Sequence, residues 1–294
     1  MLSEPQPISP QQQHSLAVAN YCAFVLHAAL AVSAVVATLR EGSVNAPTFW
    51  PGATWNATQC RADGYGPGVQ ICPSADAAEF YADVNFSAVL IISQATTALF
   101  HLWQALQAAR PGSSYIQNAQ LGIKLFHWIE YTATAAFIAW VVLYFSGILS
   151  IRAQLLGFAA QSTLMLVGLL QDVMRHCALR RVLSFATARA VILFSFVIGF
   201  ANVCAVWLPS LARLWGTETE APAFVKYVVL AEALLYSSFG IAQLAWFTPF
   251  LIYGAESTKR YFEEEMTLVV LSFLAKATLA SVFSVCLVYR QCGN

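Results

Sequence analysis

The sequence predicts an all-α membrane protein folded as a bundle of seven transmembrane helices. Hydrophobic residues make up 59% of its 294 residues and charged residues only 10%, against roughly 25% charged residues in soluble domains. Apolar runs long enough to cross a bilayer recur along the whole chain. The formal net charge is zero, so nothing in the composition favours a nucleic-acid partner.

Seven apolar runs are the expected spans, and short polar segments separate them. The runs cover residues 16–39, 82–108, 119–146, 151–174, 185–209, 223–253 and 266–290. Turn-forming or charged segments end several of them: Arg110-Pro111-Gly112, Ser146-Gly147, Arg175 to Arg181, and Pro209 to Pro222. We therefore expect one seven-helix domain over residues 16–290.

The segments outside the spans complete the expected organisation. Residues 1–15 are polar and lack the basic region of a signal peptide, so we expect a cytoplasmic segment and an uncleaved first span. Residues 40–80 form a long loop rich in Gly, Pro, Asn and Asp, and residues 291–294 form a short extracellular tail.

Two features predict that the N-terminus is cytoplasmic and the C-terminus extracellular or lumenal. More Lys and Arg residues follow the even-numbered spans than the odd-numbered ones, which the positive-inside rule assigns to the cytoplasm. The loop 40–80 contains the glycosylation sequon Asn56-Ala57-Thr58, together with Cys60 and Cys72, and these features suit an extracellular loop. Whether Asn56 is glycosylated and whether the two cysteines form a disulfide stay open.

Lys276 is the one charged residue in the apolar stretch from Leu268 to Tyr289. A charge near the middle of a bilayer costs roughly 2.5–3.5 kcal/mol on insertion scales, so an intramembrane lysine indicates a functional site. Burial favours the neutral amine, which can form a Schiff base with an aldehyde or ketone. The alternative is a structural ion pair with a buried carboxylate.

Glu130, inside the third span, is the natural partner for that charge. A buried lysine and a buried carboxylate that face each other can both stay charged. Alternatively, Glu130 is a neutral acid bonded to a backbone carbonyl. Ser272 precedes Lys276 by one helical turn and shares its face, so its hydroxyl could bond the lysine nitrogen or its own backbone.

Other protonatable residues lie within the spans, namely His27, His101, His127 and Glu232. The three histidines could form a proton-accepting cluster with a glutamate, or each could be a hydrogen-bonded packing residue. Glu232 could belong to a proton path or lie at the membrane interface. No pair of these residues has the spacing of metal ligands on a helix, so we expect no metal site.

Further acidic residues, Asp83, Asp172 and Glu263 to Glu265, lie near the ends of the expected spans. We interpret them as solvated or helix-capping residues.

The local sequences around these residues resemble the heliorhodopsin family, a branch of microbial-type retinal proteins with inverted topology. LVVLSFLAKATLASVF resembles its seventh helix and FHWIEY its third-helix motif. ALFHLW and FVLHAAL resemble the segments with the second- and first-helix histidines, and VGLLQD and SSFGIAQL resemble fourth- and sixth-helix stretches. The resemblance implies a rhodopsin-like bundle, and the sequon is typical of a eukaryotic or viral member.

Carried over by position, the resemblance implies that Lys276 holds all-trans retinal as a protonated Schiff base. Glu130 would be the counterion, with Ser272 nearby, and His27 and His101 would line a polar cavity that takes up the Schiff-base proton. Further retinal contacts would come from Tyr131, Leu164, Gly168, Phe200, Tyr236 and Gln243. The family also implies a homodimer, with strands from the loop 40–80 at its interface.

Two residues depart from the family pattern. His127 stands where relatives often have arginine, and Glu232 stands at a position that is usually apolar. Both add a protonatable group to the interior of the expected bundle.

The sequence is therefore compatible with three functions. The resemblance predicts a photoreceptor, not an enzyme, that signals to an unknown partner after light-driven isomerisation and deprotonation. A light-gated proton-conducting transporter or channel would use Glu130, Glu232 and the histidines. A seven-span enzyme or receptor without retinal would use Lys276 as a catalytic amine or a structural cation.

Overall fold

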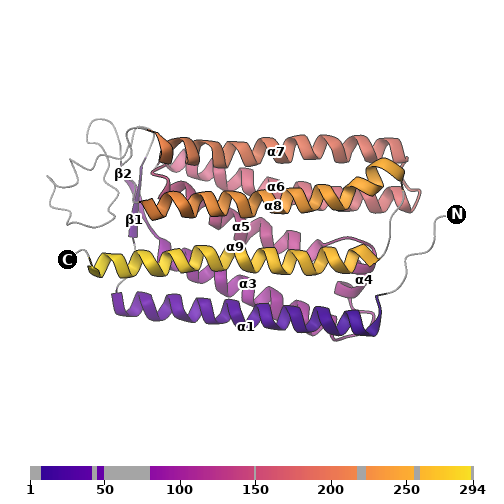
Figure 1. The fold of residues 1–294 in the computed structure, drawn as a ribbon, viewed down its shortest axis with the longest axis horizontal. Helices are drawn as coiled ribbons and strands as arrows, with labels where there is room; N and C mark the ends of the chain where they lie inside the picture. Colours follow the sequence, from indigo (N-terminus) through magenta and orange to yellow (C-terminus); the bar gives the residue numbers. More distant parts are fainter. Residues whose placement is uncertain are drawn as a thin grey trace.

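The computed structural model describes residues 8–41, 45–49, 80–148, 150–216, 223–254 and 259–292. Its long helices lie side by side along one axis (Figure 1). The helices are α1 (Pro10–Glu41), α3 (Phe86–Ala108), α4 (Ser114–Gln120), α5 (Leu125–Phe145), α6 (Ile151–Leu179), α7 (Phe185–Trp215), α8 (Ala223–Tyr253) and α9 (Lys259–Cys292).

Local sequence signals define several helix ends. Asn85 accepts a hydrogen bond from the backbone of Ala88 at the start of α3, and Ser184 does the same for Thr187 at the start of α7. Gly147 and Gly254 follow α5 and α8 with positive φ angles of 76° and 65°, which glycine adopts without strain. Polar caps and glycines thus separate helices that are otherwise apolar.

Six of these helices are long and apolar enough to cross a membrane: α1, α3, α5, α6, α7 and α8. The 34-residue α9 contains Lys276 and runs alongside α1 and α8. Large apolar side chains such as Leu39 and Phe194 are exposed, whereas polar ones such as Asn20 and Gln104 are buried. This distribution and the six helices of spanning length indicate an integral, multi-pass membrane protein.

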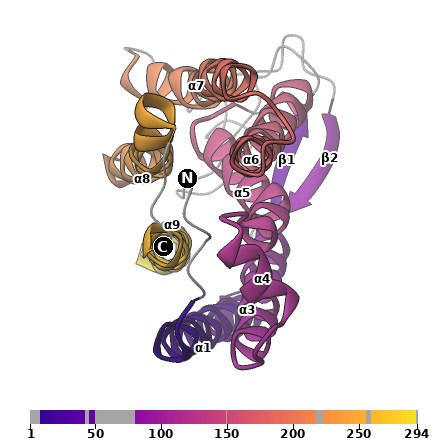
Figure 2. The same ribbon diagram turned by 90° about the vertical axis from the view of Figure 1, so that its right-hand side faces the viewer.

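The long helices form a closed ring in the order α1, α3, α5, α6, α7, α8, α9, since each contacts the next and α9 contacts α1. Figure 2 views this ring along the helices. α5 also contacts α7, α8 and α9 across the ring, so it passes closest to its centre. Groups on the inner faces of α5 and α9 are therefore brought together.

The structure differs from the expected spans at two places. The segment expected as 119–146 is divided, because α4 ends at Gln120 and the turn with Gly122 at φ 70° precedes α5. The antiparallel pair of β1 (Asn45–Phe49) and β2 (Phe80–Asn85) agrees with the strands expected from the long loop, but β2 includes residues 82–85, which were expected at the start of the second span. The predictions for Asn56, Cys60 and Cys72 fall outside the described residues.

Candidate functional site

Lys276 and Glu130 form a buried ion pair between α9 and α5. The lysine is 2% exposed and the glutamate 0%. Thr134, one turn after Glu130, donates to the backbone carbonyl of Glu130 at 3.0 Å and lies 3.4 Å from its carboxylate. The Lys276 nitrogen also lies 5.2 Å from the centre of the Tyr131 ring. Each charge is therefore compensated inside the bundle, which makes its burial tolerable.

A cavity of about 500 Å³ adjoins this pair. Its volume falls within the roughly 300–1,000 Å³ of small-molecule sites. The residues that the sequence singled out for the chromophore site are found in its wall, except for Glu130: Tyr131, Leu164, Gly168, Phe200, Tyr236, Gln243, Ser272 and Lys276. Phe200 differs from the rest of the wall because it is 71% exposed.

Tyr131 and Tyr236 join the walls of the cavity across helices. Tyr131 donates its hydroxyl to the carbonyl of Leu268 on α9 at 3.0 Å. Tyr236 on α8 donates to the carbonyl of Ala135 on α5 at 3.2 Å. Both side chains are buried, so these hydrogen bonds fix the distances between the three helices that enclose the lysine.

Gly168 gives the cavity wall its local shape. A Cβ atom at this position of α6 would lie 2.6 Å from the ring of Trp128, closer than any real contact. The indole therefore packs directly on the α6 backbone and lines the cavity.

The three interior histidines lie together on another side of the lysine. His27 and His101 stack with ring centres 5.5 Å apart, and the His127 ring lies 6.4 Å from that of His101. All three are 0% exposed. Gln94 connects them to the site, because it contacts His27 Nδ1 at 2.8 Å and donates to the Lys276 carbonyl at 3.2 Å.

Glu232 lies apart from the histidines, on α8 one turn before Tyr236. It is 0% exposed, and neither carboxylate oxygen has a hydrogen-bond partner within the described part of the chain. Glu232 is therefore enclosed within the bundle and is not exposed at its surface.

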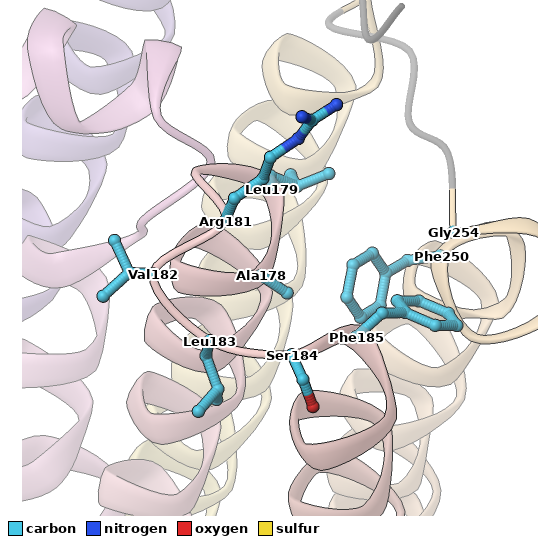
Figure 3. Close-up of a pocket in the computed structure, with 9 residues that line it drawn as sticks. All are labelled: Ala178, Leu179, Arg181, Val182, Leu183, Ser184, Phe185, Phe250 and Gly254. Atoms are coloured by element: carbon cyan, nitrogen blue, oxygen red, sulfur yellow. The ribbon is translucent and has the colours of Figure 1, made fainter.

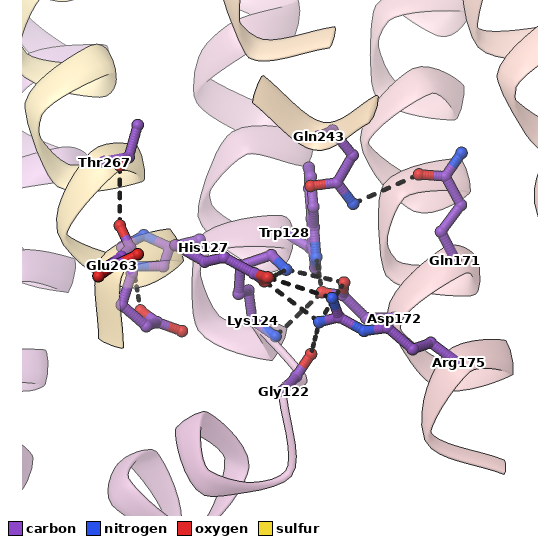
Figure 4. Close-up of polar contacts among 12 residues, drawn as sticks. Gly122, Lys124, His127, Trp128, Gln171, Asp172, Arg175, Gln243, Glu263 and Thr267 are labelled. Atoms are coloured by element: carbon purple, nitrogen blue, oxygen red, sulfur yellow. Dashed lines mark hydrogen bonds and ion pairs between the residues drawn. The ribbon is translucent and has the colours of Figure 1, made fainter. Parts of the chain in front are cut away.

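A buried ion cluster was missed by the sequence interpretation. Lys124, just before α5, contacts Asp172 of α6 and Glu264 of α9, both at 2.8 Å. Arg175 contacts Glu264 at 3.2 Å and donates to the Gly122 carbonyl at 2.7 Å. Figure 4 shows Lys124, Asp172 and Arg175 converging beside Gly122. All four charged residues are at most 2% exposed.

The interpretation of Asp172, Glu264 and Glu265 as solvated or capping residues is therefore wrong. Their carboxylates contact cations or hydrogen-bond donors on other helices, and only Glu263 of the acidic run is exposed. The presence of Lys124 and Arg175 at neighbouring span ends could have indicated these ion pairs, because opposite charges can pair there.

The ion cluster also affects Lys124, which precedes the span Leu125–Phe145. Burial by itself lowers the pKa of this lysine. The nearby carboxylates of Asp172 and Glu264 together raise the pKa by more than burial lowers it, so it lies above the usual value. Lys124 is therefore a cation at neutral pH.

A second hollow of about 410 Å³ lies at the turn between α6 and α7. Apolar side chains such as Leu183 and Phe250 line it, and the charged end of Arg181 points away from it (Figure 3). Among the described residues, no group of His, Cys, Asp and Glu could hold a metal ion. The cavity at Lys276 is thus the best candidate site.

A lysine–carboxylate pair beside a cavity in a membrane helix bundle is typical of the retinal-binding rhodopsins. The family model described as Heliorhodopsin matches residues 16–287. The chain therefore belongs to the heliorhodopsin family, a family of retinal-binding, light-sensing membrane proteins. No curated protein matches it.

Proposed function

We propose that this protein is a photoreceptor that carries all-trans retinal on Lys276, with Glu130 as the counterion. The main support is the position of the Lys276 amine, which lies in the wall of the cavity and pairs with a buried carboxylate. Apolar and aromatic side chains form most of the remaining wall, which suits a polyene chain.

The chain's own residues would divide the work. Retinal bound to Lys276 supplies a protonated Schiff base and a light-driven isomerisation. Glu130 would hold the positive charge on the Lys276 nitrogen in the dark, and Ser272 would offer a hydroxyl one turn away. Tyr131 and Tyr236 would restrict the space beside the chromophore. The burial of the site would strengthen the attraction between Glu130 and the charged nitrogen of Lys276, because water is excluded there.

The expected membrane arrangement completes the proposal. With α9 as the seventh span, the N-terminus would be cytoplasmic and the C-terminus extracellular or lumenal. A homodimer and an unknown signalling partner, both implied by the family resemblance, are part of the same proposal.

Reconstitution with all-trans retinal tests the proposal. The wild-type protein should acquire a visible absorption band, and borohydride reduction should leave retinal on the peptide that contains Lys276. Lys276→Ala should lack both signals, whereas Lys226→Ala, outside the cavity wall, should retain them. A band that survives in Lys276→Ala would exclude this attachment site.

Light-gated proton conduction is a second candidate function, and the burial of Glu232 favours it. A buried carboxylate inside a membrane helix is a common element of proton pathways. Voltage-clamp recordings at several pH gradients should show a light-dependent current that Glu232→Gln reduces without loss of visible absorption. The absence of current under every gradient would exclude proton conduction and leave the photoreceptor function as the remaining candidate.

A further inference from the structure

His127 and Glu265 form a buried pair that has no assigned role in the proposed photoreceptor function. His127 Nε2 lies 2.7 Å from a carboxylate oxygen of Glu265, and the two residues are 0% and 2% exposed. Tyr115 on α4 donates to the same oxygen at 3.2 Å. An ionised carboxylate only accepts hydrogen bonds, so we assign the proton of the imidazole to Nε2.

The other ring nitrogen of His127 is consequently an acceptor. Its Nδ1 atom is buried and has no hydrogen-bond partner among the described residues. A histidine with one N–H held by a carboxylate and a free nitrogen on the other side is the arrangement of a general base. The carboxylate fixes the tautomer and stabilises the imidazolium that forms when the free nitrogen takes a proton.

His27 and His101 lack such a partner. His27 Nδ1 contacts the Gln94 side-chain oxygen, and His101 Nδ1 contacts that of Asn20, each at 2.8 Å. Both amides donate through their nitrogens to backbone carbonyls, so their oxygens accept from the histidines. A neutral amide stabilises an imidazolium less than a carboxylate does. Of the three histidines, His127 is therefore the best place for an added proton.

The position of His127 connects it to the lysine by two routes. Its ring lies 5.7 Å from the Tyr131 ring, which in turn lies 5.2 Å from the Lys276 nitrogen. On the other side, the stacked rings of His101 and His27 lead to Gln94 and the Lys276 backbone. These separations exceed a direct hydrogen bond, so transfer would require a bridging water or a ring rotation.

We propose that His127, oriented by Glu265, is the base on which the proton from the Lys276 nitrogen comes to rest. The step breaks the N–H bond at Lys276 and forms an N–H bond at His127 Nδ1, with no other reactant. Glu265 is a positioning residue that orients the His127 ring. Among the described residues, the titratable groups in ring or hydrogen-bond contact with the pair are His101 on α3, Tyr115 on α4 and Tyr131 on α5. The inference rests on the proposed attachment of retinal to Lys276.

Two variants and one matched control test this inference. His127→Arg places a permanent cation beside Glu265 that cannot accept a proton, and Glu265→Gln removes the negative charge at nearly constant size. Glu263→Gln makes the same change at an exposed position of the same helix. Loss of the proton from the Lys276 nitrogen, followed by flash absorption, should slow by roughly 100-fold in His127→Arg. It should slow in Glu265→Gln and stay unchanged in Glu263→Gln.

Spectroscopy provides readouts that do not depend on these rates. Nitrogen-15 NMR of the dark protein should show His127 as a neutral ring with its proton on Nε2. Light-minus-dark infrared spectra with ring-labelled histidine should show an imidazolium signal that His127→Arg abolishes. An imidazolium at His127 in the dark, or unchanged kinetics and infrared signals in both variants, would overturn the inference. A wild-type protein without any visible band would overturn the retinal proposal as well.

Discussion

The indole Nε1–H of Trp128 donates a hydrogen bond of 2.7 Å to Asp172. Trp128 also lines the cavity beside Lys276, whereas Asp172 belongs to the buried ion cluster with Lys124 and Arg175. One side chain thus connects the candidate chromophore site to the charges at the end of the bundle. A displacement of the indole ring would change the hydrogen bonding of that cluster directly.

Trp128→Phe should weaken this connection without opening the cavity wall. The variant retains an aromatic ring on Gly168 but leaves one oxygen of Asp172 with fewer donors, at about 1–3 kcal/mol of stability. Thermal denaturation followed by circular dichroism measures the change. The control is Trp103→Phe, because Trp103 packs at a tilt against Phe126 and does not line the cavity. Equal melting temperatures for the two variants would contradict a role for the Asp172 bond.

Asp172→Asn should destabilise the protein more strongly. It leaves Lys124 and Arg175 with Glu264 as the remaining carboxylate of the cluster, and an uncompensated buried charge costs about 3–5 kcal/mol. Unfolding in increasing denaturant measures the difference. The exposed Glu263→Gln should change stability by less than about 0.5 kcal/mol, and a similar small effect for Asp172→Asn would mean that the cluster is not a major stabilising element.

The ion pairs of Lys124 should stabilise the protein over a defined pH range. Because its pKa is raised above the usual 10.5 in the folded protein, its contribution is fully present below that value. It is lost as the pH rises through the higher pKa of the folded state. The stability difference between wild type and Lys124→Met should therefore be constant near neutrality and shrink in strong alkali.

Lys226→Met is the control for this pH series, since Lys226 lies on α8 and is only partly buried. Its stability difference should stay small throughout. A difference for Lys124→Met that grows above the usual lysine pKa would have the wrong sign for this ion pair.

Gly168→Ala should disturb the cavity, whereas Gly240→Ala should not. A Cβ at Gly168 would meet the Trp128 ring at 2.6 Å, but a Cβ at Gly240, which lines the same cavity, has nothing within 4 Å. We expect Gly168→Ala to lose about 1–3 kcal/mol and to bind retinal more weakly, as measured by titration of the visible band. Equal retinal binding by both variants would show that this packing does not shape the site.

Glu130→Gln should shift the visible band to longer wavelength. The substitution removes the negative charge beside the Lys276 nitrogen, and that charge stabilises the ground state of the bound cation. Absorption spectra of the reconstituted variant and wild type measure the shift, and Glu263→Gln, at an exposed position, is the control. A Glu130→Gln band at the wild-type wavelength would argue against Glu130 as the counterion.

Composition and local motifs were enough to predict the class of the protein and to single out its candidate site. Length and apolarity predicted seven spans, six of which the structure confirms as candidate spans within the described residues, and local motifs predicted the family that the comparison confirms. Lys276 and Glu130 were singled out because a charge within an apolar run is expensive. A charge within an apolar run can be recognised from the sequence alone, before its partner is known.

The sequence could not show which groups at the span ends are buried and which are exposed. Asp172, Glu264 and Glu265 look like solvated residues along the chain, yet partners from other helices surround them. Phe200 lines the cavity and is nevertheless 71% exposed. Burial at a helix end depends on how α4, α5, α6 and α9 pack together. Contacts between residues 48 to 150 positions apart fix that packing, and the spacing within a single helix contains no record of them.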